Sequence, residues 1–487
     1  MPLPKLQLQL PVNESQSVNE SQQLRASINL NGSLRANQDE VTMLTRSYNP
    51  YNFTTEGFTS KGSNGGQHYK ISEKDIWIIR RQGAGASSTV FKGFHFRENR
   101  FVAVKKINVL DRETRHQMLN DVKALCDARA VPGLIAFAGA FHMPDSGQIA
   151  IVLEYMDGGS LQDVLEKVGS IPEDILSLIT ARILVGLTYL HRQKHMVHRD
   201  IKPGNILVNS DGDPKITDFG ISAFIDSTLA VCNTFLGTVT YMSPERINNE
   251  QYSFSADIWS LGLVLIECAT GKYPYDASVG PLQLMIQVLN DDLPLPEGPN
   301  VSPEFKDFLT QCLRKNPYER PTAEQLLQHP FITKHASGPP GALKAYMHRV
   351  FDPHDKLDEI TIIFTWNYYA LLSGGQGQLQ ALAPLYSDAS VLEYDGAKCK
   401  GRQAIMAQLA SASASHAARR IQKHEVKSVD CQPLGLDGSA LVHVQGSQVS
   451  EVAGDAEAAV PFTEAFILCQ VQPGEYYVAN QVHRTLA

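Results

Sequence analysis

His-Arg-Asp-Ile-Lys-Pro-Gly-Asn, the stretch at residues 198–205, lies between a helical run and a short apolar run at residues 206–208. Asp-Phe-Gly follows at residues 218–220. An aspartate that can orient a hydroxyl, a nearby lysine, an asparagine and a second aspartate suited to a divalent cation make a compact set of groups for phosphoryl transfer. The two stretches therefore predict a phosphoryl-transfer site built from Asp200, Lys202, Asn205 and Asp218.

The composition limits the class of protein. At 487 residues the chain is long enough for about two to three domains, and its net charge of -8 argues against nucleic acid and anionic membranes as partners. The seven cysteines lie far apart without a Cys-x-x-Cys pair, which is typical of reduced thiols and not of a disulfide framework or a zinc site. No apolar stretch approaches the ~18 residues of a membrane span. We expect a soluble cytoplasmic protein, with the nucleus as a further compartment.

The first 70 residues are rich in Asn, Ser, Gln and Gly. They predict a disordered region, residues 1–70, because little apolar surface is available to offset the entropy of ordering. Within it, leucine and glutamine alternate at residues 6–10 after Lys5. This segment is either a docking peptide that lies extended in a partner's groove or an apolar tail without a partner.

A loop of small residues follows at residues 83–88, between predicted strands at residues 76–79 and 90–94. Such a loop lets backbone amides approach phosphate oxygens. A third strand at residues 101–105 ends in Val-Ala-Val-Lys. This motif follows the loop at the expected spacing in the sequence, so that Lys105 can reach the α and β phosphates of a nucleotide. The loop and the lysine together predict a nucleotide-binding site.

The chain changes character at the connector of residues 154–159. Before it, an amphipathic helix at residues 112–127 precedes strands near residues 134–141 and 148–153, and beyond it helices dominate from Pro172 onward. This order predicts a small β-rich lobe on a larger α-rich lobe, with the chemistry at the cleft between them.

With these motifs in this order, residues 73–333 resemble a eukaryotic protein kinase catalytic domain, which implies ATP and Mg²⁺ as cofactors. The resemblance implies that Asp200 orients the acceptor hydroxyl and accepts its proton, while Lys202 contacts the γ-phosphate. Asn205 and Asp218 would hold the metal. The nucleotide contacts that it implies are Gly83, Ala84, Gly85, Ala86, Ser87, Ser88, Val90, Ala103, Lys105, Leu153, Glu154, Met156 and Leu207.

Two supporting motifs belong to the same resemblance. Glu245, in a Ser-Pro-Glu triplet where the family has Ala-Pro-Glu, would form a buried ion pair with Arg320. Asp257 would brace the catalytic loop from below. The resemblance thus also implies how the larger lobe is held together.

The sequence departs from the kinase pattern at two positions. Ser88 replaces the third glycine of the phosphate loop, and we expect little loss from this small side chain. Asp121 stands where the family has a glutamate opposite Lys105. Because aspartate is one methylene shorter, we expect a weakened Lys105–Asp121 pair and an active state that is populated only after activation.

Three stretches, at residues 154–161, 208–210 and 237–246, closely resemble mitogen-activated protein kinase kinases. The resemblance implies a dual-specificity enzyme with an upstream mitogen-activated protein kinase kinase kinase as its activator. Its substrate would be the Thr-x-Tyr activation loop of a downstream mitogen-activated protein kinase. The alternative is a pseudokinase-like scaffold that assembles such a cascade, and Asp121 is the feature that favours it.

Candidate regulatory hydroxyls lie between the two activation-loop ends. Thr228 and Thr234, separated by five residues, resemble the plant-type phosphorylation pair of this family, and Ser227 is a neighbouring candidate. Phosphates there would add charge that Arg199, beside the catalytic Asp200, can bind.

The remaining chain predicts a second domain. Residues 334–342 read as a linker, and residues 343–487 contain helices followed by strand-like runs, which indicates an α+β fold. Residues 401–405 and 462–466 resemble the nuclear-transport-factor-2-like family. The expected fold class is therefore a bilobal protein kinase fold followed by an α+β, cone-shaped nuclear-transport-factor-2-like domain of the plant and green-algal type.

Two functions are open for this second domain. It is either a module for a protein ligand or self-association, or a small-molecule pocket that Tyr368, Tyr394 and Asp395 would line. A fold does not determine a function, and no paired acid and base groups indicate catalysis here. We expect that the second domain binds a protein or associates with itself.

Overall fold

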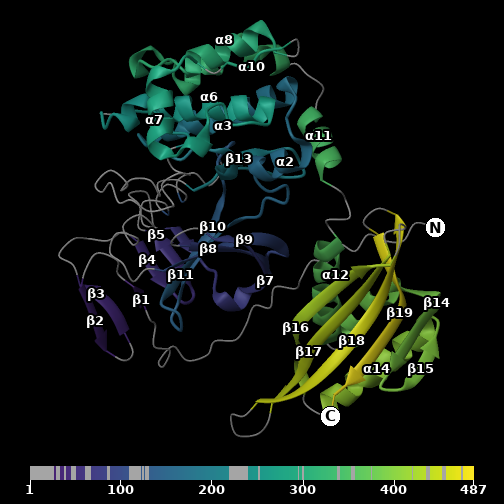
Figure 1. The fold of residues 1–487 in the computed structure, drawn as a ribbon. Helices are drawn as coiled ribbons and strands as arrows, with labels where there is room; N and C mark the ends of the chain where they lie inside the picture. The colour runs from purple at the N-terminus through teal and green to yellow at the C-terminus, as the bar shows by residue number, and fades with distance from the viewer. Residues whose placement is uncertain are drawn as a thin grey trace. The chain divides into compact units, whose positions relative to one another are not determined.

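The structure is a computed structural model of the whole chain. It describes residues 27–28, 33–37, 40–44, 51–60, 67–84, 88–108, 122, 126, 131–218, 240–250, 253–293, 295–298, 301–336, 341–351, 357–373, 376–418, 421–434, 439–451, 457–472 and 475–486. The described residues form two compact units (Figure 1). The boundary between them in the sequence lies between Phe351 and Asp352.

The first unit contains a five-stranded antiparallel sheet in the order β10-β11-β9-β8-β7. Its strands are β7 (Ile76–Ala84), β8 (Ser88–His95), β9 (Arg100–Asn108), β10 (Phe137–Met143) and β11 (Gln148–Glu154). Val102 and Val104 of β9 pack with Ala150 and Val152 of β11 in a small core on one face. Alternate residues of a strand point to the same face, so these apolar positions select that face for burial.

The prediction of disorder for residues 1–70 is wrong for the strands that the structure describes between Ser27 and Tyr69. Strands β1 (Ser27–Ile28), β4 (Tyr51–Thr54), β5 (Gly57–Ser60) and β6 (Gln67–Tyr69) form a four-stranded sheet, and β2 (Ser33–Asn37) pairs with β3 (Glu40–Leu44). Phe53 and Phe58 are fully buried, and the Phe58 ring lies 5.8 Å from the rings of both Tyr69 and Phe137. These aromatic side chains supply the apolar surface that offsets the entropy of ordering, and Phe137 of β10 completes their packing. The leucine-rich segment at residues 6–10 lies outside the described residues.

Helices make up most of the remaining first unit. They are α2 (Leu161–Val168), α3 (Glu173–Gln193), α5 (Pro244–Ile247), α6 (Ser255–Thr270), α7 (Pro281–Asn290), α8 (Pro303–Cys312), α9 (Ala323–Leu326) and α10 (Pro330–Ala336). Two short strands, β12 (Ile206–Val208) and β13 (Pro214–Ile216), form a hairpin beside them.

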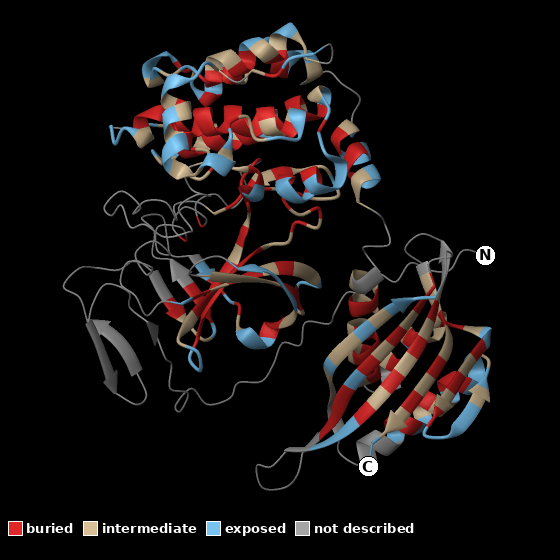
Figure 2. Cartoon of the chain, in the orientation of Figure 1, coloured by how far each residue is buried: buried red, intermediate tan, exposed pale blue. Residues whose placement is uncertain are grey.

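Helices α3 and α6 carry the core of this lobe, as the buried residues of Figure 2 show. Helix α3 is long and apolar enough to cross a membrane by length and composition, but 61% of its most apolar window is buried inside the unit. A core helix of a folded domain has this composition.

The boundary between the two units falls later in the chain than the sequence predicts. Residues 334–336, expected in the linker, belong to α10, and helix α11 (Ala342–Val350) packs on α2 and α3 of the first unit. Its apolar residues Leu343, Tyr346 and Met347 are buried there. The amphipathic pattern predicts a helix, but only packing decides which core receives its apolar face.

The second unit is an α+β domain with a six-stranded sheet in the order β15-β14-β19-β18-β17-β16. The strands are β14 (Tyr386–Tyr394), β15 (Ala397–Lys400), β16 (Ile421–Pro433), β17 (Ala440–Glu451), β18 (Glu457–Gln472) and β19 (Glu475–Thr485). The helices are α12 (Leu357–Ser373), α13 (Gln376–Leu379) and α14 (Arg402–Ala418). The sheet is antiparallel except where β14 pairs with β19 in parallel, and that pair brings the first strand of the domain beside the last.

A polar network lies inside this domain. The Tyr386 hydroxyl donates to Gln481 Oε1 at 2.5 Å, Gln481 Nε2 donates to the Tyr368 hydroxyl at 2.6 Å, and the Tyr369 hydroxyl donates to Glu464. Of the three residues expected to line a pocket, Tyr368 and Tyr394 are buried, whereas Asp395 is exposed in the turn between β14 and β15. Two of the three therefore lie in the interior, and Asp395 does not.

Candidate active site

The predicted catalytic residues converge in the loop between α3 and β12. Asn205 Nδ2 donates to Asp200 Oδ2 at 2.7 Å and to the Asp200 carbonyl at 2.8 Å, and Lys202 Nζ lies 2.8 Å from Asp200 Oδ2. These contacts restrict the rotamer of the Asp200 side chain. The loop therefore presents a carboxylate in a set orientation with a cation beside it.

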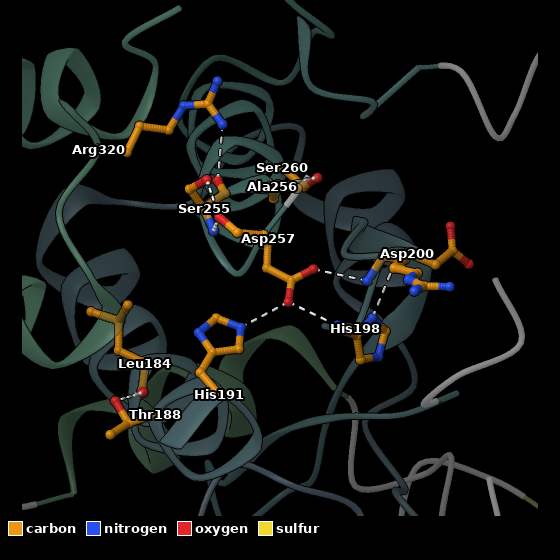
Figure 3. A network of polar contacts seen from close by, with 12 residues as sticks. Leu184, Thr188, His191, His198, Asp200, Ser255, Ala256, Asp257, Ser260 and Arg320 are labelled. Carbon is orange, nitrogen blue, oxygen red and sulfur yellow. Dashed lines mark hydrogen bonds and ion pairs between the residues drawn. The ribbon is translucent and has the colours of Figure 1, made fainter. Parts of the chain in front are cut away.

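A buried carboxylate on α6 holds this loop through backbone hydrogen bonds (Figure 3). Asp257 is fully buried, and its Oδ1 accepts from the Arg199 backbone N–H while its Oδ2 accepts from that of His198, both at 2.8 Å. His191 Nε2 lies 2.8 Å from the same Oδ2. Burial raises the pKa of Asp257, but the hydrogen bonds and charges of His191 and His198 outweigh it, so the net pKa is lowered. The carboxylate stays ionised and can hold Arg199 at its positive φ of 72°.

Lys105 of β9 reaches across to the end of the β12–β13 hairpin. Its Nζ lies 2.5 Å from Asp218 Oδ1, and the lysine is 6% exposed. Burial raises the pKa of Asp218, but the adjacent Lys105, together with His198 and Lys202, lowers it below its ordinary value. Asp121, the predicted partner of Lys105, lies outside the described residues.

The sheet register places several predicted nucleotide contacts on one face. Val90 is directly opposite Lys105 in the β8–β9 pair, and Ala103 is directly opposite Leu153 in the β9–β11 pair. Since Ala103 and Lys105 are two residues apart, all four side chains share a face of the sheet. Of the predicted phosphate loop, Gly83, Ala84 and Ser88 lie in β7 and β8, whereas Gly85, Ala86 and Ser87 are outside the described residues.

The connector after β11 is tied to both lobes, which the sequence did not indicate. The Glu154 carboxylate accepts from the Ala136 backbone N–H at 2.6 Å and from Lys215 Nζ at 2.7 and 2.9 Å. Met156, two residues further on, is buried, and Leu207 of β12 is half-buried. These contacts set the backbone of the connector that the kinase resemblance assigns to adenine.

The donor atoms at Asn205 and Asp218 fit a divalent metal ion. Because the amide nitrogen of Asn205 bonds to Asp200, its amide oxygen is the atom left for a cation, and the lowered pKa keeps Asp218 ionised. Within the described part of the chain, no group of three or more His, Cys, Asp or Glu side chains could hold a metal. A cation here would take its other ligands from phosphate oxygens and water, as Mg²⁺ does.

Two anchors fix the segment that follows the activation loop. Arg320 donates to both oxygens of Glu245 at 2.7 and 2.8 Å, and both side chains are buried, so the predicted ion pair is present. The sequence did not indicate the second anchor, in which the Tyr241 hydroxyl donates to Glu267 of α6 at 2.5 Å. The predicted phosphorylation sites Ser227, Thr228 and Thr234 lie outside the described residues.

The comparisons with known proteins cover both units. A family described as "Protein kinase domain" matches residues 78–332, and one described as "Nuclear transport factor 2 (NTF2) domain" matches residues 360–485. The chain is 43% identical to "Mitogen-activated protein kinase kinase 3" of Arabidopsis thaliana over 84% of this chain and 80% of that relative. It is 37% identical to "Mitogen-activated protein kinase kinase 2" of the same plant, over 68% of this chain and 89% of that relative. It is 32% identical to "Dual specificity mitogen-activated protein kinase kinase 1" of Dictyostelium discoideum, over 58% of this chain and 57% of that relative.

Proposed function

Because this chain belongs to the mitogen-activated protein kinase kinases and carries a nuclear transport factor 2 domain, we propose that it phosphorylates both the threonine and the tyrosine of a Thr-x-Tyr activation loop in a downstream mitogen-activated protein kinase. The chain is an ATP-dependent protein kinase that uses a divalent metal, and we propose Mg²⁺ as that metal. The observation that carries the proposal is the arrangement of Asp200, Lys202 and Asn205 on a loop that Asp257 holds in place.

In this proposal the residues of the loop divide the chemistry. Asp200 orients the acceptor hydroxyl and takes its proton, since Asn205 Nδ2 donates to its Oδ2 and restricts the rotamer of its side chain. Lys202, 2.8 Å from the same carboxylate, offsets negative charge on the transferred phosphoryl group. A divalent cation, when bound, neutralises charge on the nucleotide phosphates. Lys105 would bind the α and β phosphates, which would replace part of its contact with Asp218.

We also propose that an upstream mitogen-activated protein kinase kinase kinase activates the enzyme by phosphorylating Thr228 and Thr234, with Ser227 as a neighbouring candidate. Two arginines, Arg199 and Arg246, lie together at the catalytic loop and support this proposal. Arg246 Nη1 donates to the Arg199 carbonyl at 2.7 Å. A phosphorylated activation loop adds negative charge that arginines bind well. We also propose that the protein acts in the cytoplasm and in the nucleus, because its seven cysteines lie far apart without a Cys-x-x-Cys pair.

For the second unit we propose a protein-binding or self-association role. Its buried Tyr368, Tyr386 and Gln481 side chains bond to one another, and Tyr369 bonds to Glu464, so these polar groups stabilise the domain and are not presented to a ligand. This favours recognition through the outer surface of the domain.

The experiment combines the full-length chain with ATP, MgCl₂ and a catalytically inactive mitogen-activated protein kinase. Mass spectrometry should find phosphate on both the threonine and the tyrosine of the Thr-x-Tyr loop. The rate should rise when an upstream kinase is added, and it should rise less for the Thr228→Ala, Thr234→Ala variant. Phosphate on neither residue, even after activation, would refute the substrate and favour the scaffold alternative.

A further inference from the structure

Helix α11 lies outside the residues that the kinase family matches, yet it packs on the first unit close to the nucleotide site. The match ends at residue 332, and α11 spans Ala342–Val350. Met347 is 1% exposed, and Leu343 and Tyr346 are also buried on the same side of the helix. At the end of the helix, Lys167 Nζ of α2 lies 4.4 Å from the ring centre of Phe351, which anchors the C-terminal end.

The Met347 side chain lies beside Gly158, in the connector just after the segment expected to bind adenine. A Cβ placed at Gly158 would lie 2.5 Å from the Val208 carbonyl oxygen and 3.3 Å from Met347 Cε. The connector is bonded to β12 at the same point, since Gly158 N–H donates to the Val208 carbonyl at 3.0 Å and Val208 N–H donates to the Gly159 carbonyl at 2.8 Å. Met347 therefore packs against a junction of connector and strand.

The same helix presses on the far end of the β12–β13 hairpin. A Cβ at Gly212 would lie 2.5 Å from the Lys344 backbone nitrogen, so the turn and the helix are in close contact. Lys344 Nζ lies 2.6 Å from Asp211 Oδ1, but both side chains are at least half exposed, so this ion pair adds little. Helix α11 thus supports the hairpin at its turn and the connector at Gly158.

Both supported segments continue directly into predicted nucleotide contacts. Gly158 lies two residues after Met156, and Val208 is adjacent to Leu207. A shift at the Gly158–Val208 junction would therefore move the connector and the floor of the adenine site relative to each other. We propose that Met347 is a positioning residue for ATP binding, acting through Gly158 and Val208 and not through contact with the nucleotide.

This proposal rests on ATP use alone and is independent of the protein substrate. The test uses full-length protein with Met347→Ala, the conservative variant Met347→Leu, and Lys344→Ala as the control on the exposed side of the same helix. Binding of a fluorescent methylanthraniloyl-ATP gives the Kd, and autophosphorylation at varied ATP gives KM and kcat. We expect Met347→Ala to raise the Kd and the KM for ATP about 3- to 10-fold with kcat within about 2-fold, because a small misplacement of binding groups weakens binding by such factors. Met347→Leu should restore most of the affinity, and Lys344→Ala should match the wild type.

An unchanged Kd for ATP in folded Met347→Ala would overturn the proposal. A fall in kcat at unchanged KM would also overturn it, because that result means that less of the protein is active while ATP binding is normal. If the alanine variant does not fold, Met347→Val serves in its place, since it removes Cε, the atom that would lie 3.3 Å from a Cβ at Gly158, and keeps much of the apolar volume. A normal Kd in that variant would likewise overturn the proposal.

Discussion

Replacing Asp257 by asparagine removes the charge that holds the catalytic loop and leaves the shape of the side chain nearly unchanged. The carboxylate accepts from the backbone N–H groups of His198 and Arg199 on different oxygens, and His191 shares one of them. Asparagine has one acceptor oxygen, so at least one backbone N–H must face its NH₂ group. An unsatisfied buried donor costs about 1–3 kcal/mol, and the bonds that remain lose their charge assistance of about 1 kcal/mol each. We expect the free energy of unfolding to fall by about 3–5 kcal/mol, a large part of a typical domain's stability.

Urea unfolding of full-length wild type and Asp257→Asn, followed by tryptophan fluorescence, measures this difference. Trp259 lies two residues from the substitution and is fully buried, so its emission reports unfolding of this lobe. Kinase activity of the folded variant should fall at least about 10-fold, because the loop that carries Asp200 is no longer held in one conformation. Asp145→Asn, in an exposed turn, is the matched control and should change neither quantity. A loss below about 1 kcal/mol with normal activity would refute the assigned role of Asp257.

The same pair of proteins gives a pH dependence with a defined sign. The folded-state pKa of Asp257 is lowered below the unfolded value, so the ionised group stabilises the fold above the unfolded pKa of about 3.9. This contribution is lost as the pH falls through the lower folded-state pKa. The difference in unfolding free energy between wild type and Asp257→Asn should be constant from neutral pH to about pH 5 and should shrink below about pH 4. A difference that shrinks near neutral pH would contradict the carboxylate assignment.

Three further outcomes are expected. Asp200→Asn should lower kcat at least ~100-fold while the Kd for ATP stays normal, since the group that orients the acceptor hydroxyl is lost and the nucleotide contacts remain; a near-normal kcat would show that another group is the base. Phe58→Ala should destabilise the first unit by about 3–5 kcal/mol because the ring is fully buried, whereas Tyr318→Ala, at a residue 91% exposed, should change stability by less than about 0.5 kcal/mol in the same denaturation experiment. Residues 352–487 expressed alone should fold, as measured by circular dichroism and a cooperative melt, because they form a compact unit with their own core; an unfolded product would show that the core needs the first unit.

The catalytic loop and the order of the lobes were predictable because phosphoryl transfer demands particular residue types at short spacings. Asp200, Lys202 and Asn205 lie within six residues, and their contacts form inside one loop. The Glu245–Arg320 pair was predictable for another reason, since a buried charge needs a partner of opposite sign and the kinase resemblance supplied the position. Short sequence motifs also carried the resemblance to each family, for example residues 198–205 for the kinase and residues 401–405 for the nuclear-transport-factor-2-like domain.

The contacts that were not predicted join residues far apart in the chain. Phe58 packs on Phe137, Tyr241 bonds to Glu267, and Met347 reaches Gly158, and neither partner in any of these pairs carries a local signal for the other. The prediction of disorder was wrong for residues 51–60 and 67–70 for this reason, because the composition of a segment does not include the apolar surface of the strand that packs against it.

The sequence by itself determined the chemistry of this protein, since reactive groups at short spacing act wherever the chain places their loop. It also determined the two domain types, because their apolar periodicities and motifs are local. Tertiary structure alone decided which core takes up Phe53, Phe58, Tyr69 and helix α11. It also showed that Asp257, which was expected to brace the catalytic loop, does so through the backbone N–H groups of His198 and Arg199. The physical reason is that burial is a property of two surfaces in contact, and a sequence segment specifies only one of them.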